Sequence, residues 1–382
     1  MKILLYGATG TIADSVFAIV DKNRSILKVV SATCNTSHLK LKKLKKKYSI
    51  KKIGINDTNS AQKYISSNNE TKNLIVGNNN FSKLITDEID IIILAISGLS
   101  PLNLSIDIVK SGKVIGLANK ECIISLGPRL LSLAKKHNTT IIPLDSEHNS
   151  IYRLLKSNNQ KFKSITITAS GGPFFNKKKS YLKNVTPIQA TRHPIWKMGK
   201  KISVDSATMM NKALEIIEAK YLFNLNSSQI NAIIHPESII HAAVNYYDNS
   251  SISLLNEPDM KIPISYLFNL DKSLNQLSNV FDKLDKKRLS FYKIDEKFFP
   301  AIKLAYEVIE LGGLAPHIFN YNNEILVNHF LEKKIKFLDI VKFNNITLKK
   351  YFKNNKNIIH PRLKDIHNAN IWINKNIFLG KI

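Results

Sequence analysis

The chain lacks the features of a disulfide-rich or membrane-spanning protein. It has only two cysteines, Cys34 and Cys122, which excludes a disulfide framework and a cysteine-based zinc site and agrees with a reducing compartment. It has no uncharged apolar run of about 18 residues, and its opening "MKILLYG" lacks the basic-then-apolar pattern of a signal peptide. We therefore expect a soluble cytoplasmic protein with no membrane partner.

Acidic residues are also scarce: 29 Asp and Glu stand against 56 Lys and Arg, and the formal net charge is +27. Such a charge raises the possibility of nucleic-acid binding. The lysines, however, are spread along the chain, and the densest run, "HLKLKKLKKKYSIKK" (38–52), carries leucines at a spacing typical of a surface helix with a solvated basic face. No nucleic-acid-binding motif is present, so we expect no nucleic-acid partner. The positive field would instead attract a small phosphorylated substrate.

The hydrophobic content of 44% is enough for two or three buried cores. Short apolar runs alternate with helical patterns over the first 145 residues. Such strands, continuously apolar and separated by helices, indicate a parallel sheet covered on both faces. We predict an α/β fold whose first domain, residues 1–145, is doubly wound and Rossmann-like. The apolar runs are "KILLYG" (2–7), "LKVVSA" (27–32), "IDIIILAI" (89–96), "KVIGLA" (113–118) and "TTIIPLD" (139–145).

A glycine-rich segment, "GATGTIADSVFAIV" (7–20), follows the first apolar run and opens a helical pattern. Such a turn lets backbone N–H groups approach a pyrophosphate at the positive end of a helix. Here Gly7 and Gly10 are followed by Ala13 in the third position, and a plain tight turn is the alternative. Because the segment has a strand before it and a helix after it, we predict dinucleotide binding.

The pattern changes from about residue 146. The segment "KSITITASGGPF" (163–174) alternates like a strand and then breaks in a Gly-Gly-Pro turn, which can present Ser170 and bare backbone amides to an anion. The loop "HPIWKMG" (193–199) has large apolar tips. It predicts a lid near residues 192–200, with a packed surface loop as the alternative.

The next segment predicts a strand over "KISV" (201–204) and a helix that Ser206 or Thr208 caps. Apolar residues cover most of this helix. Its polar residues recur at helical spacing and share one face, so they form a stripe that faces a wet cavity; a solvent-exposed face is the alternative. The stripe consists of Thr208, Asn211, Lys212 and Glu215.

Two acidic residues, Asp145 and Glu147, directly follow the last apolar run of the first domain. In an extended chain, residues two apart point to the same side, and Glu215 of the helix offers a third carboxylate. Carboxylates that converge without a cation repel one another and raise each other's pKa. A hard-oxygen site for Mg²⁺ or Mn²⁺ therefore explains these residues better than a bare acid–base pair.

Several motifs together resemble the 1-deoxy-D-xylulose-5-phosphate reductoisomerase family. The resemblance covers almost the whole chain, and the stretch from His193 to Ala219 is its most specific part. It implies an NADPH-dependent rearrangement of 1-deoxy-D-xylulose 5-phosphate to an aldehyde, followed by hydride reduction to 2-C-methyl-D-erythritol 4-phosphate in non-mevalonate isoprenoid biosynthesis. We also expect a homodimer. The motifs are "GATGTIA", "LANKE" (117–121), "DSEHN" (145–149), "SGGPF" (170–174), "HPIWKMGKKISVDSATMMNKALEIIEA", "HPESIIH" and "PDMKIPI".

The resemblance also implies roles for individual residues. Asp145, Glu147 and Glu215 would hold Mg²⁺ or Mn²⁺, with Co²⁺ as a further option, and the metal would polarise the substrate carbonyl. Ser170, Ser206, Asn211 and Lys212 would bind the substrate phosphate. Lys120, a catalytic candidate, would lie with Ser146 and His193 near the sugar backbone. Trp196 and Met198 would belong to the lid, whose closure excludes water. The residues matching cofactor-contacting positions are Thr9, Gly10, Thr11, Ile12, Asn35, Asn119, Glu121, Met198 and Gly199.

Other polar residues of these motifs need no direct role in the reaction. We expect His148, His235 and His241 to be structural, hydrogen-bonded histidines. Asp205 and Glu218 fit positions behind the metal ligands or on the helix surface better than ligand positions.

The remaining division of the chain follows from its patterns. We predict a central catalytic domain of α+β type over residues 146–290. Residues 291–382 have helical patterning and no constellation of functional residues, which predicts a small C-terminal helical domain.

The chain departs from the family pattern in three places. The loop "AISGLSPLNL" (95–104) is shorter, Ala13 replaces a commoner glycine, and "NYNNE" (320–324) replaces a more alanine-rich segment. The departures concern loop geometry and rate, and they leave every predicted metal and phosphate ligand in place.

The segment after the second strand, "SATCNTSHLK" (31–40), contains no acid. A carboxylate there would hold the ribose hydroxyl of NADH and repel a 2′-phosphate, so its absence favours NADPH. The family places a glycine and a basic residue where this chain has Thr33 and Cys34, and only His38 or Lys40 could substitute for the missing cation. We predict an NADPH preference that persists but is weaker than the family pattern implies. It would rest on Asn35, Thr36, Ser37 and the nearby basic helix.

Two other functions fit part of the sequence. Another NAD(P)-dependent dehydrogenase, such as a semialdehyde dehydrogenase, would need a catalytic cysteine in a turn, whereas Cys122 lies in "KECII". A basic binding protein that has the fold without turnover is the non-enzyme alternative. Metal-dependent oxidation of NADPH in the presence of the sugar phosphate separates both from the main hypothesis.

Overall fold

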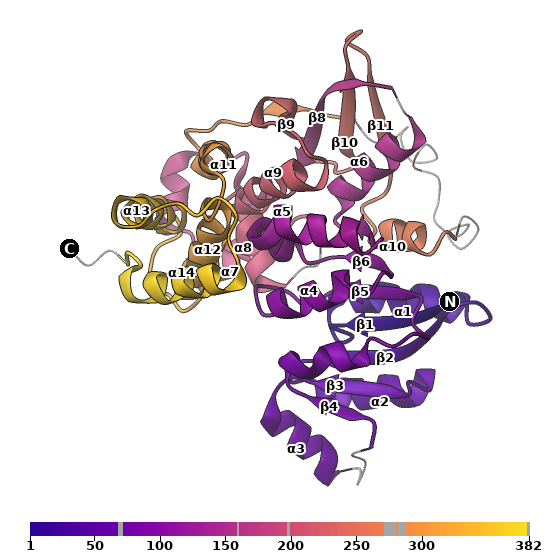
Figure 1. Cartoon of the computed structure of the whole chain (residues 1–382). Coiled ribbons are helices and arrows are strands. Elements are labelled where there is room, and N and C mark those ends of the chain that lie inside the picture. Colours follow the sequence, from indigo (N-terminus) through magenta and orange to yellow (C-terminus); the bar gives the residue numbers. More distant parts are fainter. Residues whose placement is uncertain (68–71, 159, 197–198, 271–279, 281–287, 380–382) are drawn as a thin grey trace. The chain divides into compact units, whose positions relative to one another are not determined.

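The computed structural model describes residues 1–67, 72–158, 160–196, 199–270, 280 and 288–379. The chain forms two compact units (Figure 1). Three of the five unit boundaries fall within helices α5 (Lys120–Lys136) and α6 (Ser146–Ser157). The domain boundaries near residues 145 and 290 stay predictions. The first unit comprises Met1–Cys122, Arg129–Asn149 and Asp259–Ser278, and the second comprises Ile123–Pro128, Ser150–Pro258 and Asn279–Ile382.

The first unit is built on a seven-stranded parallel sheet in the order β4-β3-β2-β1-β5-β6-β7 (Figure 1). The order runs outward from β1 in both directions, as in a doubly wound fold, which confirms the predicted fold class. Five of the strands lie in the predicted apolar runs. The apolar-run pattern does not find β3 and β4, because they are only four and three residues long. The strands are β1 (Lys2–Tyr6), β2 (Lys28–Cys34), β3 (Lys52–Ile55), β4 (Leu74–Val76), β5 (Ile91–Leu94), β6 (Val114–Leu117) and β7 (Thr140–Pro143).

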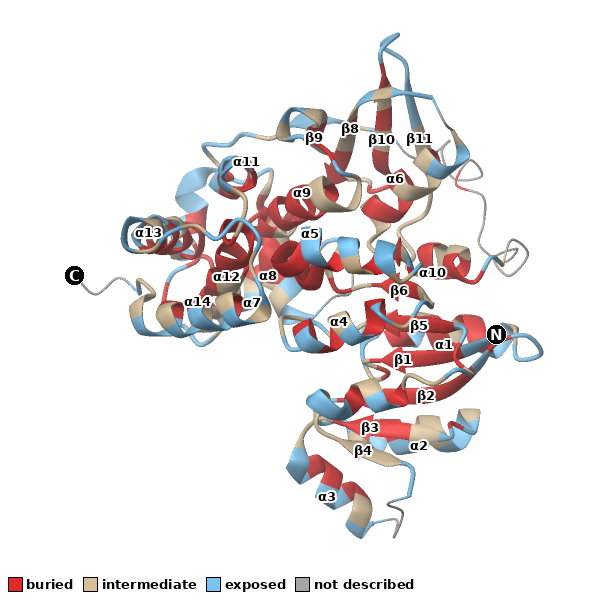
Figure 2. Cartoon of the chain, in the orientation of Figure 1, coloured by how far each residue is buried: buried red, intermediate tan, exposed pale blue. Residues whose placement is uncertain are grey.

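Helices join these strands and leave the sheet largely buried (Figure 2). Helix α2 is the predicted basic surface helix, although only Leu41 of its leucines is fully buried and Leu39 is exposed. Helix α10 comes from much later in the sequence and packs into the same unit. Its Leu267 meets Gly116 of β6 so closely that a Cβ there would lie 2.4 Å from the leucine Cδ2. The helices are α1 (Thr11–Lys22), α2 (His38–Tyr48), α3 (Thr58–Ser66), η1 (Asn78–Leu84), α4 (Leu102–Val109) and α10 (Lys261–Leu267).

The second unit contains a mixed sheet in the order β11-β10-β8-β9-β12. Strands β8 and β9 are parallel, and the other neighbouring strands are antiparallel. Strand β11 is at one edge of the sheet. The strands are β8 (Phe162–Ala169), β9 (Ile230–Ile234), β10 (Ile240–Tyr246), β11 (Ser251–Leu255) and β12 (Tyr292–Lys293).

The rest of the second unit is mainly helical, and the predicted C-terminal helical region is present as α11–α14 (Figure 1). An apolar cluster joins Val204 and Ala207 to Leu326, Val327 and other C-terminal residues. The helices are η2 (Gly172–Phe174), η3 (Lys179–Asn184), α7 (Pro187–Ala190), α8 (Lys200–Ala207), α9 (Met210–Leu222), η4 (Ser227–Gln229), α11 (Pro300–Leu311), α12 (Ala315–Leu331), α13 (Asp339–Asn354) and α14 (Leu363–Asn376). None of the helices in the described segments has the length and apolar character needed to cross a bilayer.

The prediction of a strand over "KISV" is wrong, because residues 200–207 form helix α8. Gly199 precedes the helix, and Ser203, Val204 and Ala207 are buried, a spacing that fits one face of a helix. Packing of this face in the apolar cluster outweighs the β propensity of Ile202 and Val204.

Candidate active-site residues

The glycine-rich turn packs tightly against the backbone that follows β5. Gly7 has φ +85°, and a Cβ on it would lie 2.5 Å from the carbonyl oxygen of Ala95, so only glycine fits. Gly10 is the exposed residue before α1, and no side chain caps the helix. The first backbone N–H groups of α1, from Thr11 and Ile12, therefore stand at an uncapped positive helix end. This arrangement fits the predicted pyrophosphate site.

Thr33 supports this turn, a role that the sequence did not predict. It occupies the position where the family has glycine, and its Oγ1 accepts a hydrogen bond of 3.1 Å from the backbone N–H of Gly7. Its methyl group packs on Gly54, where a Cβ would lie 2.9 Å from Thr33 Cγ2. The departure from the family at Thr33 is thus accommodated by a glycine on the neighbouring strand.

Polar side chains line the loop ends beside β2. Asn56 donates a hydrogen bond of 2.9 Å to the side chain of Asn35 and accepts one of 2.8 Å from the backbone N–H of Asn78. Lys40 reaches from α2 to the glycine turn, where its Nζ lies 3.2 Å from the carbonyl oxygen of Thr9 and 2.7 Å from Asp14 Oδ1. A cation therefore stands close to the turn even though Cys34 replaces the family's basic residue.

Asn119 and Glu121 flank the start of α5. The buried Asn119 side chain donates to the carbonyl oxygens of Ile96 and Gly98, at 2.7 and 2.8 Å, and accepts from the backbone N–H of Cys122 at 2.7 Å. It thereby holds the short loop 95–104 against the helix. Glu121 is 7% exposed. Contact of either residue with a cofactor stays a prediction.

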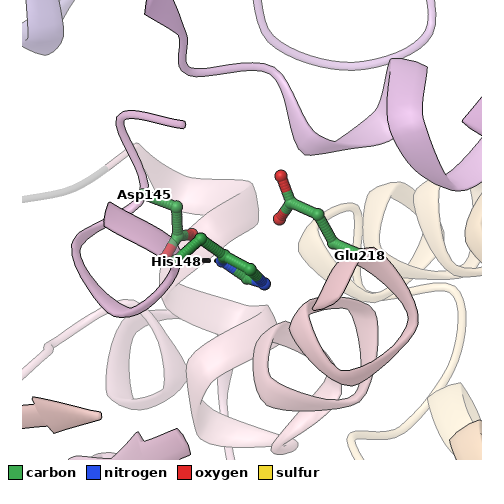
Figure 3. A group of neighbouring side chains, drawn as sticks. All are labelled: Asp145, His148 and Glu218. Carbon is green, nitrogen blue, oxygen red and sulfur yellow. Dashed lines mark ion pairs between the residues drawn. The ribbon is translucent and has the colours of Figure 1, made fainter. Parts of the chain in front are cut away.

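Asp145 contacts two basic side chains of its own unit, and Figure 3 draws one of them, His148. Lys120 Nζ lies 2.7 Å from Asp145 Oδ2, and His148 Nδ1 lies 3.3 Å from Oδ1. The contact with Asp145 distinguishes His148 from a histidine that serves packing alone. Lys120 and Asp145 are each 14% exposed at the side chain. The role of Asp145 as a metal ligand stays a prediction.

Glu147 lies near Asp145, but the predicted reason was wrong. Helix α6 begins at Ser146, so the chain is not extended between the two acids. The Glu147 N–H lies 3.3 Å from Asp145 Oδ1, and the Ser146 hydroxyl donates to Glu147 Oε2 at 2.6 Å. A helix start, rather than strand alternation, sets the direction of these carboxylates.

Helix α9 carries the predicted polar stripe of the second unit. Lys212 and Glu215 are 3% and 1% exposed, which excludes the alternative of a solvent-exposed face. Asn211 donates to Glu215 Oε1, and Lys212 forms an ion pair with Glu215 Oε2. Lys212, predicted to bind the phosphate, and Glu215, predicted to bind the metal, are thus in direct contact on one helix.

The predicted helix cap is wrong in one respect. Met209, in the left-handed region at φ 60°, precedes α9 and separates it from α8. Thr208 still accepts a hydrogen bond of 3.3 Å from the backbone N–H of Met210, whereas Ser206 is one of the last residues of α8. The left-handed turn was not predicted because Met rarely adopts it and tertiary contacts impose it.

The Ser170 turn contacts the loop that contains His193. The Ser170 hydroxyl lies 3.0 Å from His193 Nε2, and His193 Nδ1 accepts from the backbone N–H of Trp196 at 2.9 Å. Nδ1 is therefore the acceptor, so Nε2 carries the proton and donates to Ser170. Burial lowers the pKa of His193 to about 4, so the imidazole is neutral near pH 7. The ring of Trp196 lies 6.3 Å from that of His241, between ring centres.

Further predictions concern Gly199, Met198 and the lid of this loop. Gly199 is exposed and directly precedes α8. Met198 lies outside the described residues. The lid near residues 192–200 therefore stays a prediction.

Neither cysteine suits nucleophilic catalysis. Cys122 is 0% exposed, and burial raises the pKa of its thiol well above the usual range. Burial also raises the pKa of Cys34 to about 12. Because the thiolate is the nucleophilic form, the semialdehyde dehydrogenase alternative lacks its catalytic residue.

Four further motif residues are buried: His235, His241, Asp205 and Glu218. His235 contacts the carbonyl oxygen of Ser290 through Nδ1 at 2.9 Å and accepts from the backbone N–H of Ile239 at 3.2 Å, as expected of a structural histidine. Asp205 and Glu218 are each 1% exposed, so a helix-surface position is excluded for both. Figure 3 draws Glu218 on α9.

Family models match three parts of the chain. Residues 3–127 match "1-deoxy-D-xylulose 5-phosphate reductoisomerase", residues 141–223 match its "C-terminal domain", and residues 255–376 match "DXP reductoisomerase C-terminal domain".

Known proteins resemble the chain along nearly its whole length. A 1-deoxy-D-xylulose 5-phosphate reductoisomerase of Clostridium novyi (strain NT) is 38% identical over 373 residues, which are 96% of each chain. That of Ruthia magnifica subsp. Calyptogena magnifica is 39% identical over 91% of each chain. The Zymomonas mobilis reductoisomerase in complex with NADPH has a TM-score of 0.87 at 33% identity, with 97% of this chain and 96% of that chain covered. A DOX-P reductoisomerase in complex with NADPH, fosmidomycin and magnesium has a TM-score of 0.89 at 32% identity, with 98% and 97% covered.

Proposed function

Because the chain belongs to the 1-deoxy-D-xylulose 5-phosphate reductoisomerase family, we propose that it converts 1-deoxy-D-xylulose 5-phosphate to 2-C-methyl-D-erythritol 4-phosphate. The reaction uses NADPH and a divalent metal and provides an isoprenoid precursor. The observation that carries this proposal is the similarity to reductoisomerases along both units of the chain.

The glycine turn of the first unit would bind the pyrophosphate of NADPH. Gly7 permits the tight turn before α1, and the uncapped start of α1 offers backbone donors from Thr11 and Ile12. The rim formed by Asn35 and Lys40 would hold the adenosine ribose and its 2′-phosphate. When bound, NADPH supplies the hydride for the reduction.

Asp145, Glu147 and Glu215 would hold the metal. All three offer carboxylate oxygens, the ligands that Mg²⁺ and Mn²⁺ prefer. The metal would replace Lys120 as the cationic partner of Asp145. Mg²⁺ is the expected ion, with Mn²⁺ and Co²⁺ as alternatives. When bound, the metal acts as a Lewis acid on the substrate carbonyl.

The substrate phosphate would be bound by groups of the second unit: the hydroxyls of Ser170 and Ser206, the amide of Asn211 and the cation of Lys212. His193 is neutral and donates a hydrogen bond to the Ser170 hydroxyl. Because Ser170 accepts this bond, the proton of its own hydroxyl stays available for the phosphate. Lys120 and Ser146 would contact the sugar backbone. Trp196 would cover the substrate as part of the lid.

We further propose a homodimer that forms through the edge strand β11. Its Ile252 is 43% exposed, and Tyr247, in the turn before it, is 68% exposed, so the edge offers both backbone hydrogen-bonding groups and apolar surface. Ile252→Lys should convert a dimer to a monomer in light scattering. A wild-type monomer at micromolar concentration would contradict this proposal. A cytoplasmic location is proposed as well, because both cysteines are free thiols.

The decisive experiment measures NADPH oxidation with 1-deoxy-D-xylulose 5-phosphate before and after removal of metal by a chelator. We expect turnover that chelation abolishes and that Mg²⁺ or Mn²⁺ restores. Folded, metal-supplied protein that oxidises no NADPH would support the basic binding-protein alternative.

A further inference from the structure

A buried carboxylate ties helix α8 to the C-terminal helices of the same unit. Asp205, near the end of α8, is 1% exposed. Its Oδ1 accepts a hydrogen bond of 2.7 Å from Nδ2 of Asn323, in α12, and its Oδ2 lies 2.8 Å from Nζ of Lys201, one turn earlier in α8. A buried charge needs such partners, so Asn323 cannot be removed without consequence for Asp205.

The end of α8 is where several proposed phosphate-binding elements meet. Ser206 follows Asp205, and its carbonyl oxygen packs on the turn after β8, where a Cβ on Gly172 would come within 2.7 Å of it. Beyond α8, the left-handed Met209 leads directly into α9 with Asn211. A shift or rotation of α8 therefore changes the position of Ser206 relative to both the turn and α9.

Apolar packing alone does not fix α8 against such a shift. Val204 and Ala207 belong to one apolar cluster with Leu326 and Val327 of α12, and contacts of this kind are non-directional. The hydrogen bond from Asn323 to Asp205 is directional and sets the register of α8 against α12.

We propose that Asp205 and Asn323 are positioning residues of the phosphate pocket. They hold α8 so that Ser206 keeps the spacing to the glycine turn and to α9 that the substrate phosphate requires. The C-terminal helical region thus affects substrate affinity without contacting the substrate. This inference rests on the proposed function, because that function assigns the phosphate to Ser206 and its neighbours.

The test compares two buried asparagines that differ in their connection to α8. Asn344 of α13 is 0% exposed like Asn323, but it bonds to α12, through the carbonyl oxygen of Phe319 and the side chain of Asn322. Asn323→Ala and Asn344→Ala should therefore lower Tm by similar amounts. Only Asn323→Ala should raise KM for 1-deoxy-D-xylulose 5-phosphate, by about 10- to 100-fold, with KM for NADPH unchanged.

A second variant pair probes the hydrogen bond itself. Asn323→Asp places two carboxylates together and should raise the same KM further, and the double variant Asp205→Asn with Asn323→Asp should recover part of the loss. Wild-type KM in Asn323→Ala, or an equal rise in Asn344→Ala, would overturn the inference.

A failure of the proposed function gives a different result. In that case wild-type protein does not oxidise NADPH with the sugar phosphate at all. The affinity of wild type, Asn323→Ala and Asn344→Ala for inorganic phosphate, measured by calorimetry, then decides the inference: a selective loss in Asn323→Ala supports it, and equal affinities reject it.

Discussion

Lys212 and Glu215 form a buried ion pair one turn apart on α9, and they are candidates for two different ligands. Lys212 is proposed to bind the substrate phosphate, and Glu215 the metal. Each balances the charge of the other, which lets a lysine and a glutamate remain buried on a largely apolar helix.

Removal of the lysine should affect the phosphorylated substrate selectively. Lys212→Ala should raise KM for 1-deoxy-D-xylulose 5-phosphate by about 10- to 100-fold, because a hydrogen bond to a charged group is lost. NADPH affinity, measured by fluorescence titration, should stay within about twofold. Lys220→Ala, a half-buried lysine on the same helix, is the control. An equal loss of affinity for substrate and NADPH would contradict the assignment of Lys212.

Removal of the Glu215 charge should affect the metal. Glu215→Gln should keep the fold and NADPH binding but weaken Mn²⁺ binding by more than about 100-fold, because a direct ligand matters at least as much as an outer-shell partner. Electron paramagnetic resonance of added Mn²⁺ measures this without turnover. The control is Glu310→Gln, an exposed acid of α11 in the same unit. Near-normal activity of Glu215→Gln at low Mn²⁺ would exclude Glu215 as a ligand.

Cofactor choice should depend on Lys40 and on salt. The side chain of Lys40 is held at the glycine turn by Thr9 and Asp14, and Lys40 is the cation proposed to bind the 2′-phosphate. We expect NADPH to be preferred over NADH, with a ratio of kcat/KM values that decreases at high salt, where exposed charges are screened. Lys40→Ala should lower the ratio by about tenfold, and the exposed Lys42→Ala should not. Equal or better use of NADH by the wild type would defeat the prediction.

Acid should destabilise the protein partly through His317. Burial lowers the pKa of His317 to about 4, and the neutral ring bonds to Ser125 and Asn370. The unfolded chain binds a proton near pH 6.5 while the folded protein does not, so stability is lost as pH falls from about 6.5 to about 4. The full contribution is on the order of 3 kcal/mol.

Urea unfolding as a function of pH tests this prediction. His317→Gln should show a flatter decline in the free energy of unfolding across this pH range than the wild type. The exposed His360→Gln is the control and should follow the wild-type curve. If the His317 variant has the wild-type pH dependence, other groups cause the loss of stability at acidic pH.

The sequence by itself determined the features that depend on local pattern. Runs of apolar residues separated by helical patterns predicted the parallel sheet, and the glycine-rich segment after the first run predicted the turn at Gly7. The sequence motifs identified the family. The spacing of Lys212 and Glu215 predicted that the two side chains share a helix face. These features are predictable because side-chain direction repeats every two residues in strands and every 3.6 in helices.

The tertiary structure alone decided the features that depend on distant residues. The segment "KISV" is helical because Val204 packs in an apolar cluster with residues more than 100 positions later in the chain. Local secondary-structure propensity does not include such distant contacts. The support of Gly7 by Thr33 and the bond from Asn323 to Asp205 join segments that the sequence separates. Met209 adopts a left-handed backbone conformation that Met rarely takes. The contacts around Met209 stabilise the fold by more than the backbone strain destabilises it.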